Sequence, residues 1–199
     1  WLGFGPDGYL YVPVGAPCNI CLKPLKDDSR FASIHRILED GSLEKVASGI
    51  RNTVGFDWHP KTEKLYFSDN GRDWLGDDSP SCELNIINEE GEFFGYPYKH
   101  ATNVIDPEYG KLISDLDMNF TDPILELGAH VAPTGIAFYD KNTFPSSFKN
   151  NLFITLHGSW NRYKKVGYKV ISVNFDDDGN YLAHKDFISG WLNDCLLYT

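Results

Sequence analysis

The stretch Phe4-Gly5-Pro6-Asp7-Gly8-Tyr9-Leu10-Tyr11-Val12 decides the fold, because it reads as a β-hairpin. Two strand-like ends flank a Pro-Asp-Gly turn, whose residues favour tight reversal of the chain. The pattern returns twice, in segments 55–60 with 64–68 and 135–139 with 151–155. A loop follows each copy, and then a second hairpin, with predicted strands at 32–38 and 43–47, 84–87 and 92–94, and 168–173 and 181–187.

Four antiparallel strands per repeat, with no helical pattern between them, are typical of a β-propeller blade. A blade takes roughly 40–50 residues and a propeller has 4–8 blades. We therefore predict an all-β chain forming about three blades, a single partial-propeller domain over residues 1–199 that is truncated at both ends. A β-sandwich with chance similarity among its hairpins fits less well, because the hairpin pairs recur in the same order.

The composition excludes several classes of protein. Of the 199 residues, 42% are hydrophobic and 15% aromatic, which supports a packed core and rules out wholesale disorder. No apolar run approaches the roughly 20 residues of a membrane span. A net charge of −10 without a basic cluster argues against nucleic acid as a partner. The spacing Cys18-x-x-Cys21 predicts a local disulfide or two thiols rather than a metal site.

The predicted topology gathers the polar loops at one end of the propeller. In an up-and-down blade, the loop entering the first strand and the loop between the second and third strands lie on the same face. The segments concerned hold the densest clusters of polar, Gly and Trp residues: 15–21, 50–54, 70–82, 129–134 and 157–167. We expect a ligand site there, at the mouth of the central channel.

An acidic run lies in one of these loops. Asp77 and Asp78 follow Gly71 and Arg72, and Glu83 comes soon after. Carboxylate and backbone carbonyl oxygens are the ligands that calcium prefers. The spacing is not that of an EF-hand, so a solvated acidic loop and a metal site both remain open.

Cationic and aromatic residues occupy the other loops of this face. We expect Arg51, His130, His157 and Arg162 to aim at one mouth, where a local cationic patch on an acidic protein favours an anionic ligand. Asn52 offers a donor and an acceptor beside Arg51. Trp160 could stack on a flat ring. Each of these residues has a plainer alternative role, in a surface salt bridge or as a hydrogen-bonded structural residue.

The sequence resembles the soluble glucose/sorbosone dehydrogenases, six-bladed propellers that use pyrroloquinoline quinone (PQQ). The resemblance spans residues 4 to about 191 and is closest to the sorbosone branch. It rests on the stretches FGPDGYLYVPVGAPCNIC, GIRNTVGFDWHP, LYFSDNGRDWLGDD, FGYPY, GAHVAPTGIAFY and LHGSWNRYKKVGYKV. There is no G-x-S-x-G, and no G-x-G-x-x-G follows a strand, so neither a serine hydrolase nor a nicotinamide site competes.

The resemblance implies a PQQ- and calcium-dependent oxidoreductase that oxidises a sugar or sugar-aldehyde and passes electrons to an external acceptor. It implies cofactor contacts at Arg51, Asn52, His130, His157, Trp160 and Arg162. It also implies calcium held by the Gly71 and Arg72 carbonyls, with Asp77, Asp78 and Glu83 stiffening that loop. A periplasmic or secreted location follows from the family alone.

Two departures from the family pattern bear on activity. The histidine that serves as base in the family would precede Trp1, and Ala16 stands where some members have an Asp. The resemblance therefore leads us to expect that this chain alone is inactive. Two other classes of function remain open: a calcium-dependent lactonase propeller and a non-catalytic extracellular binding propeller.

Overall fold

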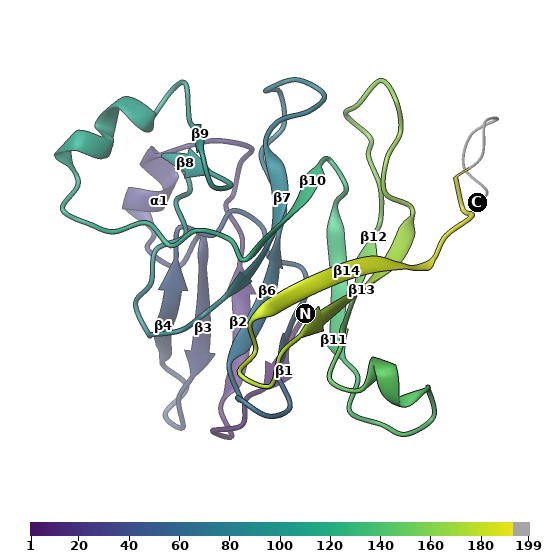
Figure 1. Cartoon of the computed structure of the whole chain (residues 1–199). Coiled ribbons are helices and arrows are strands. Elements are labelled where there is room, and N and C mark those ends of the chain that lie inside the picture. Colours follow the sequence, from purple (N-terminus) through teal and green to yellow (C-terminus); the bar gives the residue numbers. More distant parts are fainter. Residues whose placement is uncertain (193–199) are drawn as a thin grey trace.

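The computed structural model describes residues 1–192 and contains three four-stranded antiparallel sheets (Figure 1). Blade 1 has the order β1-β2-β3-β4, with strands β1 (Gly3–Phe4), β2 (Leu10–Val14), β3 (Ser33–Ile37) and β4 (Leu43–Ser48). Blade 3 has the order β11-β12-β13-β14, with strands β11 (Pro133–Phe138), β12 (Leu152–Leu156), β13 (Lys169–Phe175) and β14 (Tyr181–Ile188). The predicted hairpin pairs of both blades are confirmed, and the chain has a β-propeller fold.

Blade 2 corrects one prediction. Its order is β10-β7-β6-β5, with strands β5 (Phe56–Trp58), β6 (Leu65–Asp69), β7 (Ser81–Ile86) and β10 (Leu125–Ala129). The strand predicted at 92–94 does not pair with β7. Instead Phe93 forms an isolated parallel bridge with Ser48, and Phe94 packs in the core between blades 1 and 2. The apolar residues of this segment therefore fill a different interface from the one that their pattern predicted.

The chain between β7 and β10 forms an excursion beside the blades (teal at the upper left in Figure 1). We call residues 87–124 the insertion. It holds a small hairpin and a short 3-10 helix: β8 (Lys99–His100), β9 (Val104–Ile105) and η1 (Gly110–Asp115). The remaining short helices are α1 (Lys23–Asp27), after β2, and η2 (Ser146–Phe148), after β11. Among the described residues, no helix has the length and apolar character needed to cross a membrane.

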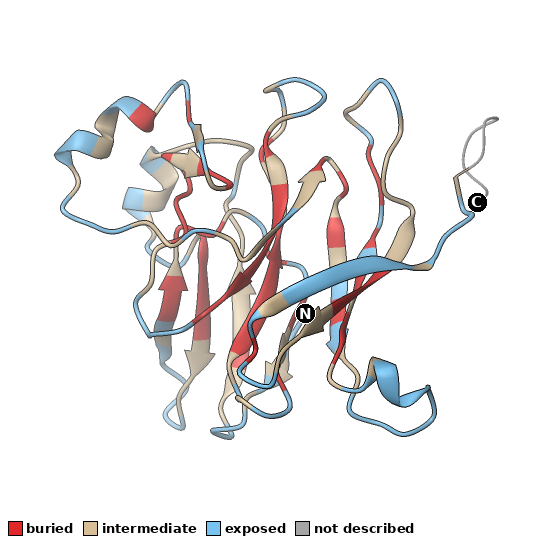
Figure 2. Ribbon diagram, viewed as in Figure 1, coloured by how far each residue is buried: buried red, intermediate tan, exposed pale blue. Residues whose placement is uncertain are grey.

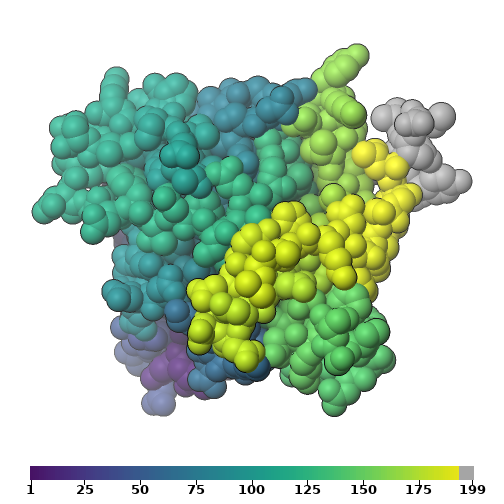
Figure 3. Space-filling view, viewed as in Figure 1, coloured from purple at the N-terminus to yellow at the C-terminus, as the bar shows by residue number. Residues whose placement is uncertain are grey.

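The cores lie between the blades, and β6 shows why. Every residue of β6 is buried, because its alternating side chains serve two interfaces. Leu65 and Phe67 pack toward blade 1, whereas Tyr66 packs toward blade 3. The edge strand β14 is mostly exposed (Figure 2) and runs across the surface in the space-filling view (Figure 3). The middle blade is therefore buried on both faces.

The first strands of adjacent blades come into close contact. A Cβ added at Gly55, just before β5, would lie 2.2 Å from the carbonyl oxygen of Thr134 in β11. Only glycine allows this approach of the two backbones. The loops after β6 and β12 and the turn between β10 and β11 then lie at one end of the molecule, at the top of Figure 1, as the sequence predicted.

Candidate functional site

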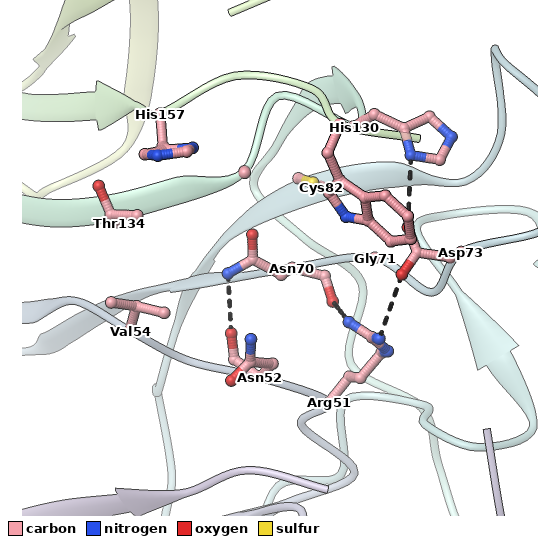
Figure 4. A pocket seen from close by; sticks show the side chains of 12 residues that line it. Arg51, Asn52, Val54, Asn70, Gly71, Asp73, Cys82, His130, Thr134 and His157 are labelled. Atoms are coloured by element: carbon pink, nitrogen blue, oxygen red, sulfur yellow. Dashed lines mark hydrogen bonds and ion pairs between the residues drawn. The ribbon is translucent and has the colours of Figure 1, made fainter. Parts of the chain in front are cut away.

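A cavity of about 400 Å³ opens among the loops at this end (Figure 4). Blade 2 and blade 3 supply its walls, and the segment before β5 completes them. The lining residues are Arg51, Asn52, Val54, Asn70, Gly71, Asp73, Cys82, His130, Ala132, Thr134, His157 and Trp160. The structure thus brings together five of the six residues predicted to contact a cofactor, and one of the predicted metal-binding residues, Gly71.

Arg51 is fixed at the base of the cavity by carbonyl groups. Its Nε donates to the Asn19 carbonyl at 3.0 Å, and its two terminal nitrogens donate to the Asn70 carbonyl and to Asn19 Oδ1, each at 3.0 Å. Nη2 also lies 3.9 Å from Asp73 Oδ2. The Arg51 side chain is 14% exposed, so it presents only part of its surface to the cavity.

Buried Asp69 determines the backbone conformation of the Arg51-Asn52 segment. Its carboxylate accepts the Arg51 N–H at 2.8 Å and the Asn52 N–H at 2.5 Å. Burial raises the pKa of Asp69 to about 6, although these backbone donors oppose the shift. Asn70 continues the same framework, because its Nδ2 donates to the carbonyls of Asn52 and Pro133.

Asp73 and His130 form the wall opposite, with the His130 ring beside the Asp73 carboxylate (Figure 4). His130 Nδ1 lies 3.7 Å from Asp73 Oδ1, and its Nε2 lies 2.8 Å from the Gly76 carbonyl oxygen. Because a carbonyl only accepts, Nε2 donates this hydrogen bond. Asn161 Nδ2 approaches the same Asp73 oxygen at 3.5 Å. Asp73 therefore has polar partners from three directions.

His157 and Trp160 line the side of the cavity formed by blade 3. The His157 N–H donates to the Ala132 carbonyl at 3.0 Å, which joins this loop to the turn before β11. His157 is exposed, and its ring makes no hydrogen bond to any residue of 1–192. Trp160 is 70% exposed. These two side chains are accessible to a ligand, whereas Arg51 and His130 are mostly enclosed.

Arg162 lies elsewhere than predicted. It does not line the cavity; instead it joins two loops. Its Nη1 donates to the Asp77 carbonyl and its Nη2 to Asp78 Oδ1 at 2.7 Å. The charged lining groups are thus Arg51 and Asp73, of opposite sign, and the predicted cationic patch does not form. Asp77 and Asp78, in a neighbouring loop, bind Arg162 outside the cavity lining, and its contact with a cofactor stays a prediction.

The predicted carboxylate cluster is also dispersed. Asp78 is exposed and binds Arg162, whereas Glu83 points inward from β7. Glu83 Oε1 accepts the Ala101 N–H at 2.6 Å, and Asn85 Nδ2 donates to Oε2 at 3.0 Å. Burial, followed by the charge of Asp69, raises the pKa of Glu83 to about 8. β7 is buried continuously from Cys82 to Ile86 in the middle blade, so Glu83 lies among buried groups rather than in the loop.

Arg72 connects the cavity loop to the insertion. Its side chain is 5% exposed and pairs with fully buried Asp106 at 2.6 Å. Asp106 in turn lies 3.0 Å from His100 Nε2. Burial lowers the pKa of His100, although the neighbouring Asp106 opposes that shift. The Arg72 side chain is therefore structural, and only its backbone is left for the metal role that the resemblance implies.

Side-chain metal ligands are not grouped in the part of the chain that the structure describes: no three His, Cys, Asp or Glu residues of 1–192 come close enough to hold an ion. Backbone oxygens are available, however. Neither the Gly71 nor the Arg72 carbonyl accepts a hydrogen bond within 1–192. Cys82, which lines the cavity nearby, is buried, and burial raises the pKa of its thiol.

Sequence reasoning missed Asn19, Asn70 and Asp73. Asn19 lies between Cys18 and Cys21. The sequence left open whether these two cysteines form a disulfide or stay as thiols, and the structure shows the disulfide. It donates through Nδ2 to the Asp73 carbonyl at 3.1 Å and accepts the Asp73 N–H at 2.8 Å. The C-N-x-C motif and the NGRD run were visible, but their contact joins residues 54 positions apart.

Comparisons with known proteins agree with this fold. Residues 114–191 match the TrAA12-like family. An uncharacterized protein of Borreliella burgdorferi is 43% identical over 185 residues, which are 92% of this chain and 48% of that protein. The calcium structure of the Trichoderma reesei carbohydrate-active enzyme of family AA12 superposes with a TM-score of 0.71 at 24% identity, covering 94% of this chain and 55% of that one.

A further solved structure is similar in fold. The holo form of the PQQ domain of Coprinopsis cinerea pyranose dehydrogenase superposes with a TM-score of 0.75 at 20% identity, covering 94% of this chain and 58% of that one. The chain thus spans about half the length of the proteins that it matches. Together these likenesses define the class of fold, the β-propeller found in PQQ-dependent sugar dehydrogenases.

Proposed function

We propose that this chain forms the cofactor-facing part of a PQQ- and calcium-dependent oxidoreductase that oxidises a sugar or sugar-aldehyde. The observation that carries the proposal is the cavity at the loop end, which combines Arg51, two histidines and an exposed Trp. The names of the similar structures, a family AA12 enzyme and a PQQ domain of a pyranose dehydrogenase, support the same chemistry.

The cavity fits a planar, polar cofactor of this kind in part. Its volume of about 400 Å³ falls in the roughly 300–1,000 Å³ typical of small-molecule sites. Trp160 offers a ring face, while His157 offers ring nitrogens that no described residue occupies. Arg51 supplies one cation for a group with three carboxylates, and Asp73 opposes it. The remaining positive charge needed to balance the three carboxylates has to come from groups outside the described lining.

Different residues of the lining would hold different parts of the cofactor. Arg51 and Asn52 would bind carboxylate or carbonyl oxygens, with their backbone held by Asp69. Trp160 would cover one face, and His130 would border the other side. PQQ supplies a quinone that accepts hydride equivalents from a sugar. The Gly71 and Arg72 carbonyls, without hydrogen-bond partners in 1–192, are the calcium ligands that we propose.

The lactonase alternative needs carboxylate metal ligands in the channel, and the residues of 1–192 do not group them. The Cys18–Cys21 disulfide supports a periplasmic or secreted location, because disulfides persist in oxidising compartments. The precise sugar and the external electron acceptor would be set by parts of the site beyond these lining residues.

Calorimetric titration of the purified chain with PQQ, with and without calcium, tests the proposal. We expect saturable binding that chelation of calcium weakens. Trp160→Phe reduces stacking area and weakens binding about threefold to tenfold. Trp74→Phe is the matched control, since Trp74 is 71% exposed but does not line the cavity. No binding, or equal effects of the two variants, would overturn the proposal.

A further inference from the structure

Asn19 connects the two charged groups of the cavity. Its Oδ1 accepts from Arg51 Nη2 at 3.0 Å and from the Asp73 N–H at 2.8 Å. Its Nδ2 donates to the Asp73 carbonyl at 3.1 Å, and its own carbonyl accepts from Arg51 Nε at 3.0 Å. Four hydrogen bonds therefore run from one residue of blade 1 to the groups that form the base and wall of the cavity.

The Cys18–Cys21 disulfide closes a small ring around Asn19. Cys18 and Cys21 are separated by three positions, so Asn19 and Ile20 are the residues enclosed between them. Tyr96 reaches the same place from the insertion, with its Oη 3.5 Å from the Asn19 carbonyl oxygen and 3.6 Å from Cys18 Sγ. A closed ring restricts the backbone conformations open to Asn19, which lowers the entropy lost when its hydrogen bonds form.

Asn19 also keeps Arg51 and Asp73 apart. Arg51 Nη2 lies 3.9 Å from Asp73 Oδ2, longer than a hydrogen-bonded ion pair, because the guanidinium is directed at the oxygens of Asn19 and Asn70. Without the Asn19 side chain, the arginine loses an acceptor on the side of Asp73. The two charges would then be drawn into direct contact within the lining, which would leave less of the guanidinium for a ligand.

We propose that Asn19 is a positioning residue of this cavity and that the Cys18–Cys21 disulfide makes its positioning sensitive to redox conditions. A dithiol reductant breaks the S–S bond by thiol–disulfide exchange. It gives two protein thiols and an oxidised, cyclic disulfide of the reagent, a two-electron transfer. The opened loop releases Asn19, so that the Asp73 amide loses its acceptor and Arg51 loses two of its three acceptors.

Amide hydrogen exchange at Asp73, followed by NMR, tests this without any cofactor. In Asn19→Ala we expect the Asp73 amide to exchange about tenfold faster. Reduction of the unsubstituted chain with dithiothreitol changes the rate in the same direction. In Asn19→Ala, reduction has no further effect, because the disulfide acts on Asp73 through Asn19.

Two controls separate positioning from general loosening. The Phe138 N–H donates to Asp57 Oδ2 at 2.7 Å, away from the cavity, and its exchange stays unchanged in all samples. Asn151→Ala removes a side chain bonded to Ser147 and Ser172 in blade 3, and leaves the Asp73 rate unchanged. The proposal is overturned if reduction leaves the Asp73 rate of the unsubstituted chain unaltered, or alters it equally in Asn19→Ala.

A PQQ titration of Asn19→Ala and of the reduced chain adds a readout that rests on the proposed function. We expect both to bind PQQ about tenfold more weakly than the oxidised, unsubstituted chain. If the unsubstituted chain does not bind PQQ, the proposed function fails, while the exchange experiment still decides the role of Asn19. If PQQ binds all forms equally, positioning by Asn19 is refuted and the proposed function stands.

Discussion

Replacing Glu83 with Gln should change how the stability of the fold depends on pH. Glu83 on β7 lies opposite Asp69 on β6 in the strand register, and both carboxyl groups are buried. Burial and the charge of Asp69 raise the pKa of Glu83 to about 8, from 4.5 when the chain is unfolded. The folded protein therefore keeps a proton that the unfolded chain releases, and stability falls as pH rises toward 8.

The size of the effect follows from the proton count. Each pH unit between the two pKa values changes the free energy of unfolding by about 1.4 kcal/mol. The difference in unfolding free energy between the native chain and Glu83→Gln should thus change by about 3 kcal/mol from pH 5.5 to pH 8. Gln keeps an oxygen for the Ala101 N–H. Its NH2 group takes the place of Oε2, and it can donate to Asn85 Oδ1 once the Asn85 side-chain amide turns over, since Oδ1 has no partner within the described residues.

Urea denaturation at several pH values, followed by tryptophan fluorescence, measures this difference. Comparison of the two proteins cancels the titration of the histidines, which is common to both. Glu126→Gln is the control: Glu126 faces Glu83 from β10, but its pKa is lowered, so its contribution is lost only as pH falls. Equal pH slopes for the native chain and Glu83→Gln would refute the burial argument.

Two further substitutions test the packing around the site. Arg72→Met leaves Asp106 buried without its cation, and we expect a loss of about 3–5 kcal/mol, measured by urea denaturation; a loss below 1 kcal/mol would contradict a buried pair. Tyr66→Phe removes the hydroxyl that donates to the Gly179 carbonyl across the interface of blades 2 and 3 at 2.6 Å. It should cost about 1–2 kcal/mol, whereas Tyr163→Phe, at a position 97% exposed, should cost nothing measurable.

Blades 1 and 3 could be predicted from the sequence because their information is local. Three of their four hairpins combine alternating apolar residues with a Gly- or Asp-containing turn, and the partner strand follows within a few residues. In the fourth, the longer connection 139–151 holds η2, but both strands are still apolar segments close in the sequence. Blade 2 could not be completed in this way. Its fourth strand, β10, comes only after the insertion, far from β7 in the sequence, and Phe94 carries an apolar pattern that serves the core next to blade 1.

The site shows the same limit. Strand topology alone predicted that Arg51, His130 and His157 would meet at one end, and they line one cavity. The hydrogen-bond partners of the site residues depend on how side chains from distant segments of the chain lie relative to one another. Arg162 was expected at the cavity but is held by Asp77 and Asp78, and Asn19 was passed over although it contacts both Arg51 and Asp73.

A crystal structure of the chain soaked with PQQ and calcium tests the central claim most directly. We predict electron density for the cofactor in the cavity, with oxygens within hydrogen-bond reach of Arg51 or Asn52 and a ring face against Trp160. We also predict a metal ion beside the Gly71 and Arg72 carbonyls. Well-ordered PQQ bound only at another surface, with this cavity filled by water alone, would contradict the account.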